Sequence, residues 1–177
     1  IVKDLNVLCF HSKQLIGNGL ILPSGPLREP LSAIKKVQIV VINGEKNLIF
    51  EDKLKKINSK ISIFYSKYKL LDQKDLNNKK ILAFAGIGNP ENFFNLLVES
   101  GLNVKKTISF PDHYDFKKDE ILEIIEKAKK LNYTVLTTEK DFLRIKNFNF
   151  SEIYPCNVIL EIAKKKEFIK LINKIYD

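Results

Sequence analysis

Short apolar stretches alternate along the chain with polar turns and with segments of helical periodicity. Runs that are rich in β-branched and aromatic side chains are typical of strands buried in a sheet. Such runs predict strands at residues 5–10, 37–43, 60–68, 80–87, 104–110, 133–138 and 156–162. All of them are much shorter than the roughly 20 apolar residues that span a bilayer, so we expect no transmembrane helix.

Helical patterns separate several of these predicted strands. Asn89 followed by Pro90 is typical of a helix N-terminus, and the apolar stripe that follows ends at Gly101. A second helix is predicted over residues 117–131, where apolar residues recur every three or four positions. Strand and helix therefore alternate between residues 80 and 138, which predicts an α/β fold with a mainly parallel sheet and flanking helices.

The pattern changes in the Lys- and Asn-rich segment 45–79, which shows strand-like runs and no clear helix. We interpret this segment as a β linker between a first module, residues 1–44, and a C-terminal α/β domain, residues 80–177. The chain begins at Ile1 and contains no Met. We therefore expect the natural N-terminus to lie upstream.

Composition narrows the classes of protein to which the chain can belong. The 177 residues are 45% hydrophobic, which suffices for a core. Cys9 and Cys156 lie far apart without CxxC spacing, which argues against a zinc site or a disulfide framework, and we expect both in the core. The net charge of +9 is spread among Ile, Asn and Glu residues instead of forming an Arg-rich block. We therefore expect no nucleic-acid partner; an RNA-binding function would rest on charge alone. The charge suits an anionic membrane surface or a phosphorylated substrate.

Loops that follow strands are the places to search for a site, because ligands of open parallel sheets bind beyond the carboxyl ends of the strands. Residues 17–30 place glycines and prolines around Arg28 and Glu29, which suits either a binding loop or a rigid connection. The turn from Gly86 to Asn89 resembles an anion-binding strand-to-helix turn. It lacks the third glycine of a dinucleotide fingerprint and the Lys-Ser/Thr of a P-loop, and a plain tight turn fits it equally well.

The stretch FPDHYDF, residues 110–116, contains one of the two histidines of the chain. A histidine titrates near neutral pH, and Asp112 can orient the imidazole of His113, so the pair could assist deprotonation of a substrate hydroxyl. The alternative interpretation is a turn closed by an Asp side-chain hydrogen bond.

The stretch TTEKDFLR, residues 137–144, follows the predicted strand 133–138. Thr138 precedes Asp141 with a spacing close to that of a capping box, which indicates a helix start. The functional interpretation is a charged rim formed by Glu139, Lys140 and Asp141.

Taken together, these segments resemble the tetraacyldisaccharide 4'-kinase family of lipid A biosynthesis. The matching motifs are GNG..LPSGPLREPL at 17–31, AGIGNPENFF at 85–94, FPDHYDF at 110–116 and LTTEKDFLRI at 136–145. The resemblance covers nearly the whole chain and corresponds to about the second half of a family member. It implies the remnant of a P-loop kinase domain, joined by a β linker to a smaller C-terminal α/β domain.

The resemblance implies a kinase that transfers the γ-phosphoryl group of ATP, with Mg²⁺, to the 4'-hydroxyl of tetraacyldisaccharide 1-phosphate, the lipid A disaccharide precursor. It also implies a peripheral protein on the cytoplasmic side of the bacterial inner membrane. His113 matches the catalytic histidine of the family, with Asp112 beside it, and its aspartate partner comes from the N-terminal half. The residues that match the substrate or nucleotide cleft are Asn18, Arg28, Glu29, Gly86, Asn89, Thr138, Glu139, Lys140 and Asp141. No metal ligand is assigned on this chain.

Two departures from the family pattern limit what the chain can do alone. The P-loop lies upstream of Ile1 in the family and occurs nowhere in this sequence. His11 stands where the pattern places a Walker-B-like Asp, and Mg²⁺ prefers oxygen ligands. We therefore do not expect the isolated chain to bind ATP or Mg²⁺, and a partner would be a separate N-terminal half with the P-loop. The alternative function is a non-catalytic remnant or interaction module of a split or decayed kinase.

Overall fold

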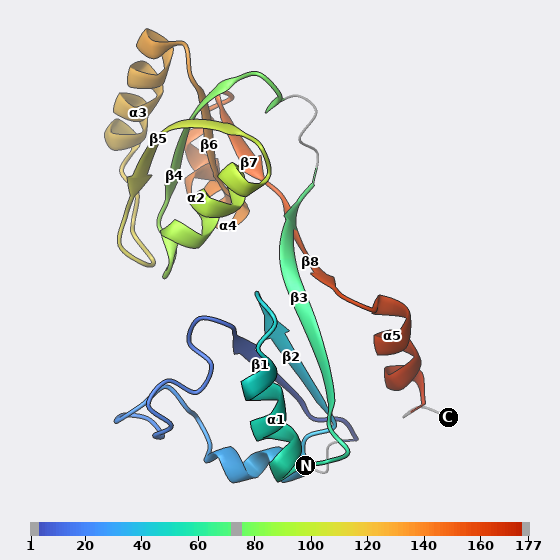
Figure 1. Cartoon of the computed structure of the whole chain (residues 1–177). Helices are drawn as coiled ribbons and strands as arrows, with labels where there is room; N and C mark the ends of the chain where they lie inside the picture. The colour runs from blue at the N-terminus through green and yellow to red at the C-terminus, as the bar shows by residue number, and fades with distance from the viewer. Residues whose placement is uncertain (1–3, 72–75, 175–177) are drawn as a thin grey trace. The chain divides into compact units, whose positions relative to one another are not determined.

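A computed structural model describes residues 4–71 and 76–174 (Figure 1). The chain divides into two compact units. Of the described residues, the first unit comprises 4–67 and 160–174, and the second comprises 68–71 and 76–159. The chain therefore leaves the first unit after Lys67 and returns to it at Leu160.

The first unit is built on the sheet β1-β2-β3-β8. Strands β1 (Val7–His11), β2 (Ile39–Asn43) and β3 (Ser62–Leu70) pair in parallel, and β8 (Val158–Ile162) lies beside β3. Strands β3 and β8 also carry residues of the second unit at one end. The helices of the first unit are the 3₁₀ helix η1 (Leu31–Lys36), α1 (Leu48–Ile57) and α5 (Lys165–Asn173).

Alternate residues of β2 form the two cores of the first unit, because successive strand side chains point to opposite faces. Val40 and Ile42 pack in a cluster with Phe50 and Leu54 of α1. Ile39 and Val41 pack in a second cluster, whose other members include the α5 residues Phe168, Leu171 and Ile172.

The second unit is built on a parallel sheet in the order β5-β4-β6-β7. Its strands are β4 (Lys80–Ala85), β5 (Asn103–Ser109), β6 (Thr134–Thr138) and β7 (Ile153–Cys156). Its helices within residues 80–159 are α2 (Pro90–Glu99), α3 (Lys118–Leu131), α4 (Glu139–Ile145) and the 3₁₀ helix η3 (Lys146–Phe148).

Helices cover both faces of this second sheet (Figure 1). Ile81, Ala83 and Ala85 of β4 pack with apolar side chains of α2. Leu82 and Phe84, on the opposite face, pack with apolar side chains of α3 and α4. This arrangement confirms the predicted α/β class with a mainly parallel sheet and flanking helices.

The structure corrects the sequence-based interpretation of segment 45–79. Helix α1 lies inside the predicted β linker, with Asn47 as its N-cap, and the Asn47 side chain accepts a hydrogen bond from Phe50 N–H. Only Phe50 and Leu54 of this helix are buried, so its apolar stripe is narrow among charged residues. The segment therefore does not consist of strands alone.

The other corrections concern the last part of the chain and one cysteine. The run predicted as one strand at 156–162 is divided between β7 and β8, which belong to different sheets. Residues 160–174 pack with the first unit instead of the predicted C-terminal domain. Cys156 is buried as expected, whereas Cys9 is exposed. Cys9 lies on the face of β1 opposite to its neighbours Leu8 and Phe10, which pack in the cluster with α1.

Candidate functional site

The candidate site lies where three strands of the second unit end. Ala85 of β4 pairs with Ser109 of β5, and Phe84 pairs with Thr137 of β6. Because these strands are parallel, the segments that follow them start at one edge of the sheet, as the sequence predicted. Those segments are the turn 86–89, the loop 110–117 and helix α4.

A buried carboxylate joins the turn after β4 to helix α4. Thr138 caps α4, and its Oγ1 accepts a hydrogen bond from Asp141 N–H at 3.1 Å. The same hydroxyl donates to Asp141 Oδ2 at 2.8 Å, and Gly86 N–H donates to Oδ2 at 2.9 Å. The Asp141 side chain is 0% exposed, so these donors satisfy a charge that has no access to water.

Arg144 extends this network towards the solvent. Its Nη1 donates to Asp141 Oδ1 and to the Gly86 carbonyl, each at 3.0 Å. Its Nη2 lies 3.0 Å from His113 Nδ1. The guanidinium is thus held on one side by buried groups and presents its other side to the imidazole.

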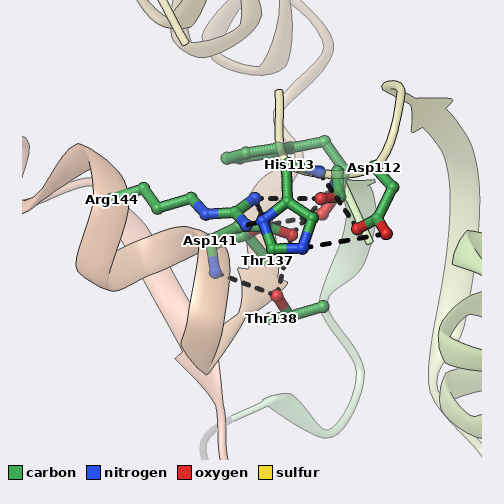
Figure 2. Close-up of polar contacts among 8 residues, drawn as sticks. Asp112, His113, Thr137, Thr138, Asp141 and Arg144 are labelled. Carbon is green, nitrogen blue, oxygen red and sulfur yellow. Dashed lines mark hydrogen bonds and ion pairs between the residues drawn. The ribbon is translucent and has the colours of Figure 1, made fainter. Parts of the chain in front are cut away.

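His113 lies on the exposed loop after β5, between Arg144 and Asp112 (Figure 2). Its Nε2 is 3.9 Å from Asp112 Oδ2, too long for a hydrogen bond, and its side chain is 73% exposed. The backbone has a φ of 59°, and His113 N–H donates to Asp112 Oδ1 at 3.0 Å. The turn itself is closed by the backbone hydrogen bond from Tyr114 N–H to the Pro111 carbonyl at 3.2 Å, and Arg144 contacts the His113 ring.

Aromatic side chains pack the loop 110–117 against strand β4. Phe110, Tyr114 and Phe116 contact one another, and Phe110 and Phe116 contact Phe84 of β4 edge to face. The Tyr114 hydroxyl donates to Glu120 Oε1 at 2.8 Å, and this hydrogen bond raises the pKa of Tyr114. These contacts fix the backbone on both sides of His113.

The turn after β4 favours glycine because side chains of the loop 110–117 approach its backbone closely. A Cβ at Gly86 would lie 3.0 Å from Phe116 Cζ, and one at Gly88 would lie 3.3 Å from Asp112 Oδ2. Gly86 N–H is already bonded to the protein's own Asp141, so it is not free to receive an external anion. Asn89 caps α2, as predicted, and its Oδ1 accepts from Asn92 N–H at 3.2 Å.

Glu139 and Lys140 lie in the first turn of α4 and border a cavity of about 430 Å³. Its other lining residues are mostly apolar and come from the same unit: Tyr68, Ile87, Asn89, Asn92, Phe93, Leu96, Thr138, Cys156 and Val158. Burial raises the pKa of the Cys156 thiol to about 12, which disfavours the thiolate that a nucleophilic cysteine needs.

The remaining predicted residues belong to the first unit. Asn18 closes its loop by donating to the Ser24 carbonyl at 2.8 Å and accepting from Leu20 N–H at 3.1 Å. Arg28 and Glu29 line a cavity of about 670 Å³ together with residues of β1 and η1. His11 ends β1, and its Nδ1 accepts from Lys13 N–H at 3.3 Å.

The second unit thus brings together Asp112, His113, Gly86, Thr138 and Asp141, whereas Asn18, Arg28 and Glu29 lie in the first unit. Sequence reasoning did not select Arg144. A local signal existed, because Arg144 follows Asp141 by one helical turn, a spacing at which opposite charges pair. Its contacts with Gly86 and His113 join residues 58 and 31 positions away, which no local pattern reports.

The described residues contain neither a metal-binding cluster nor a membrane-spanning helix. Within residues 4–71 and 76–174, no group of three or more His, Cys, Asp or Glu side chains could hold a metal ion. No helix in these same ranges is both long enough and apolar enough to cross a bilayer.

Comparison with known proteins places these features in a family. A family model described as Tetraacyldisaccharide-1-P 4'-kinase matches residues 1–177. A tetraacyldisaccharide 4'-kinase from Pelagibacter ubique is 39% identical over 175 residues, covering 97% of this chain and 56% of that protein. One from Bradyrhizobium diazoefficiens is 35% identical over 171 residues, covering 95% of this chain and 49% of that protein.

The fold is similar to that of LpxK from Aquifex aeolicus, whose "apo" form was crystallised in complex with ATP. The TM-score is 0.66 at 23% identity, over 99% of this chain and 54% of that one. The chain therefore spans about half the length of the relatives that it matches.

Proposed function

Because the chain belongs to the tetraacyldisaccharide-1-phosphate 4'-kinase family, we propose that it forms the C-terminal half of such a kinase. The proposed reaction transfers the γ-phosphoryl group of ATP to the 4'-hydroxyl of tetraacyldisaccharide 1-phosphate. The proposed location is the cytoplasmic face of the bacterial inner membrane, where a net charge of +9 favours an anionic surface.

The observation that carries the proposal is the arrangement of His113 on an exposed loop whose base is rigid. Phosphoryl transfer depends mainly on positioning and charge stabilisation, and one group orients the attacking hydroxyl. His113 is accessible, and Arg144 holds its ring at 3.0 Å. We assign to His113 the role of positioning or assisting the base that acts on the acceptor hydroxyl, with Asp112 beside it.

In this proposal the site for Mg²⁺ and ATP lies mainly on the other half of the kinase. When bound, these would supply the phosphoryl group and neutralise the developing charge. The sequence contains no G-x-x-x-x-G-K-S/T stretch to cradle phosphates, and the described residues offer no cluster of metal ligands. We place the chain's contribution on the acceptor side of the reaction, and a P-loop half, covalently joined or separate, would supply the donor side.

His11 supports a second candidate function, a non-catalytic remnant or interaction module. It ends β1, at the position where the family pattern has an acidic residue, and an imidazole is a poor replacement for a carboxylate towards Mg²⁺. If the carboxylate at this position is essential, a completed protein would keep the fold and lose the reaction.

The test completes the chain with the N-terminal half of the Pelagibacter ubique relative, as a fusion, and measures phosphate transfer from ATP to tetraacyldisaccharide 1-phosphate. We expect His113→Ala to lower turnover about a hundredfold, the lower end of the scale for losing an acid–base group. We expect no change in the stability of the fusion, because the side chain is largely exposed.

His11→Asp in the same fusion separates the two candidate functions. Activity only after this substitution would support a decayed kinase, and activity without it would support the enzyme. A fusion that stays inactive with either residue, or one indifferent to His113→Ala, would contradict the proposed function. For the isolated chain, calorimetry should detect no ATP binding; micromolar 1:1 binding, about 8 kcal/mol, would contradict the assignment of the donor side elsewhere.

A further inference from the structure

Arg144 makes contacts that a purely structural helix residue would not need. Its Nη1 is shared between the Asp141 carboxylate and the Gly86 carbonyl, and its Nη2 faces His113 Nδ1. The Arg144 side chain is 23% exposed, whereas Asp141 is fully buried. The guanidinium is therefore anchored from within the unit through Nη1, and its Nη2 is directed at the imidazole (Figure 2).

The chemistry of the two partners fixes the direction of this hydrogen bond. A guanidinium has only donors, so His113 Nδ1 must accept. A protonated imidazole has no free lone pair, and therefore the contact is a hydrogen bond only with the neutral ring. In the neutral ring one nitrogen carries the proton and the other accepts, which leaves the proton on Nε2.

Little else orients the His113 ring. Its backbone is held by the hydrogen bond from its own N–H to Asp112, and Asp112 Oδ2 is 3.9 Å from Nε2. An exposed side chain with no other close partner would rotate and exchange between tautomers. The bond from Arg144 removes both freedoms.

We propose that Arg144 is a positioning residue for His113, which it holds as the neutral tautomer with the proton on Nε2. In this state His113 acts as an N–H donor towards an anionic oxygen, such as a carboxylate that serves as base or a phosphate oxygen, and not as the proton acceptor. No proton changes place in this step. The role of His113 in the reaction rests on the proposed function above, whereas the assignment of its tautomer to the hydrogen bond from Arg144 does not.

The experiment is ¹⁵N NMR of the imidazole nitrogens in the 177-residue chain, at alkaline pH. The chain has two histidines, so His11→Gln assigns the signals of His113. We expect a single tautomer, with Nδ1 unprotonated and shifted as a hydrogen-bond acceptor. Arg144→Met should abolish that acceptor shift, and Arg144→Lys, which keeps a cation near Asp141, should retain part of it.

Lys146→Met is the matched control, since it removes an exposed cation just beyond the same helix. It should leave both nitrogens of His113 unchanged. A proton on Nδ1 in the wild type, or identical His113 signals in the wild type and Arg144→Met, would overturn the proposal.

Arg144→Met also removes the partner of a buried carboxylate and could unfold the unit. The hydrogen bond between Arg144 and His113 is therefore also measured on Arg144, in the variant His113→Ala, which changes an exposed residue. In the wild type the Arg144 Nη protons should exchange slowly with water, and His113→Ala should speed the exchange of those on Nη2 severalfold. Equal rates would contradict the hydrogen bond.

The completed kinase provides the functional measurement. Arg144→Met should lower kcat about tenfold to a hundredfold, the scale for a misplaced group, with KM little changed. Arg144→Lys should restore part of the loss, and Lys146→Met should be without effect. A completed wild-type protein that is inactive while the tautomer is fixed would contradict the proposed function and leave the role of Arg144 standing. Full activity in Arg144→Met would show that Arg144 does not position His113 for the reaction.

Discussion

Replacement of Asp141 tests whether the buried carboxylate holds the second unit together at the site. Its oxygens accept hydrogen bonds from Gly86 N–H, the Thr138 hydroxyl and Arg144 Nη1. Asp141→Ala leaves a buried N–H without a partner and removes the counter-charge of Arg144. Asp141→Asn keeps the size, but it replaces the charge and turns an NH₂ group towards at least one of these donors.

The expected magnitude follows from the burial of each partner. Breaking a buried ion pair costs about 3–5 kcal/mol, and an unsatisfied buried N–H costs about 1–3 kcal/mol. Arg144 retains 23% exposure, so water compensates part of its loss and the lower end applies. We expect about 3 kcal/mol for Asp141→Ala, about 2 kcal/mol for Asp141→Asn and about 1 kcal/mol for Thr138→Ala, which removes the helix cap.

The assay is urea unfolding followed by far-UV circular dichroism and by tyrosine fluorescence, since the chain has no Trp. A loss of about 3 kcal/mol corresponds to roughly 10 °C in Tm for a chain of this size. Glu139→Gln is the matched control, because it neutralises an exposed acid in the same helical turn and should cost about 0.5 kcal/mol. If Asp141→Ala costs no more than Glu139→Gln, or Asp141→Asn stabilises the protein, the buried network does not stabilise the unit at this edge of the sheet.

Further outcomes follow from other parts of the chain. At pH 8 a thiol reagent should label Cys9 in the native protein and Cys156 only in denaturant. Burial raises the pKa of Cys156 from 9.0 to about 12, which lowers its thiolate fraction about a thousandfold. Labelling of both cysteines in the native protein would contradict the burial of Cys156. The hydrogen bond from Lys117 N–H contributes most to lowering the pKa of Glu120 below 4.5. The stabilisation of the fold by ionised Glu120 is therefore complete above pH 4.5 and is lost as the pH falls below that value. Glu120→Gln should flatten the acid side of a plot of unfolding free energy against pH. Asn89→Ala should cost about 1 kcal/mol in urea unfolding by removing the N-cap of α2, and a loss below about 0.3 kcal/mol would refute the cap.

The central part of the second unit could be predicted from the sequence because its signals are local. The strands β4, β5 and β6 are short apolar runs, and α2 and α3 show helical periodicity. The caps Asn89 and Thr138 have side chains that bond the backbone three residues on. Parallel pairing then places the loops after these strands at one edge, so the proximity of His113 to α4 could be expected from the sequence alone.

The elements that were missed have weak or misleading local patterns. Helix α1 has a cap at Asn47 and apolar residues at helical spacing, Phe50, Leu54 and Ile57, so a local signal was present, but the Lys- and Asn-rich composition of the segment obscured it. The apolar run of β7 and β8 is continuous in sequence, and nothing local indicates that it changes sheets. Whether the chain at 160–174 packs with the first or the second unit depends on contacts with β2 and β3, which are distant in sequence.

The site contains buried residues that contribute to stability and an exposed residue that can contact a substrate, and the exposed fraction of each side chain distinguishes them. Asp141 is fully buried and His113 is 73% exposed, with Arg144 between them at 23%. A change at Asp141 should therefore impair folding and, through Arg144, the orientation of the ring. A change at His113 should affect chemistry alone, since the network beneath it remains complete. Arg144 takes part in both effects, and its two nitrogens separate them. The contact of Nη1 with Asp141 contributes to the free energy of unfolding, whereas the contact of Nη2 with His113 is measured by the state of the imidazole and by the exchange of the Nη2 protons.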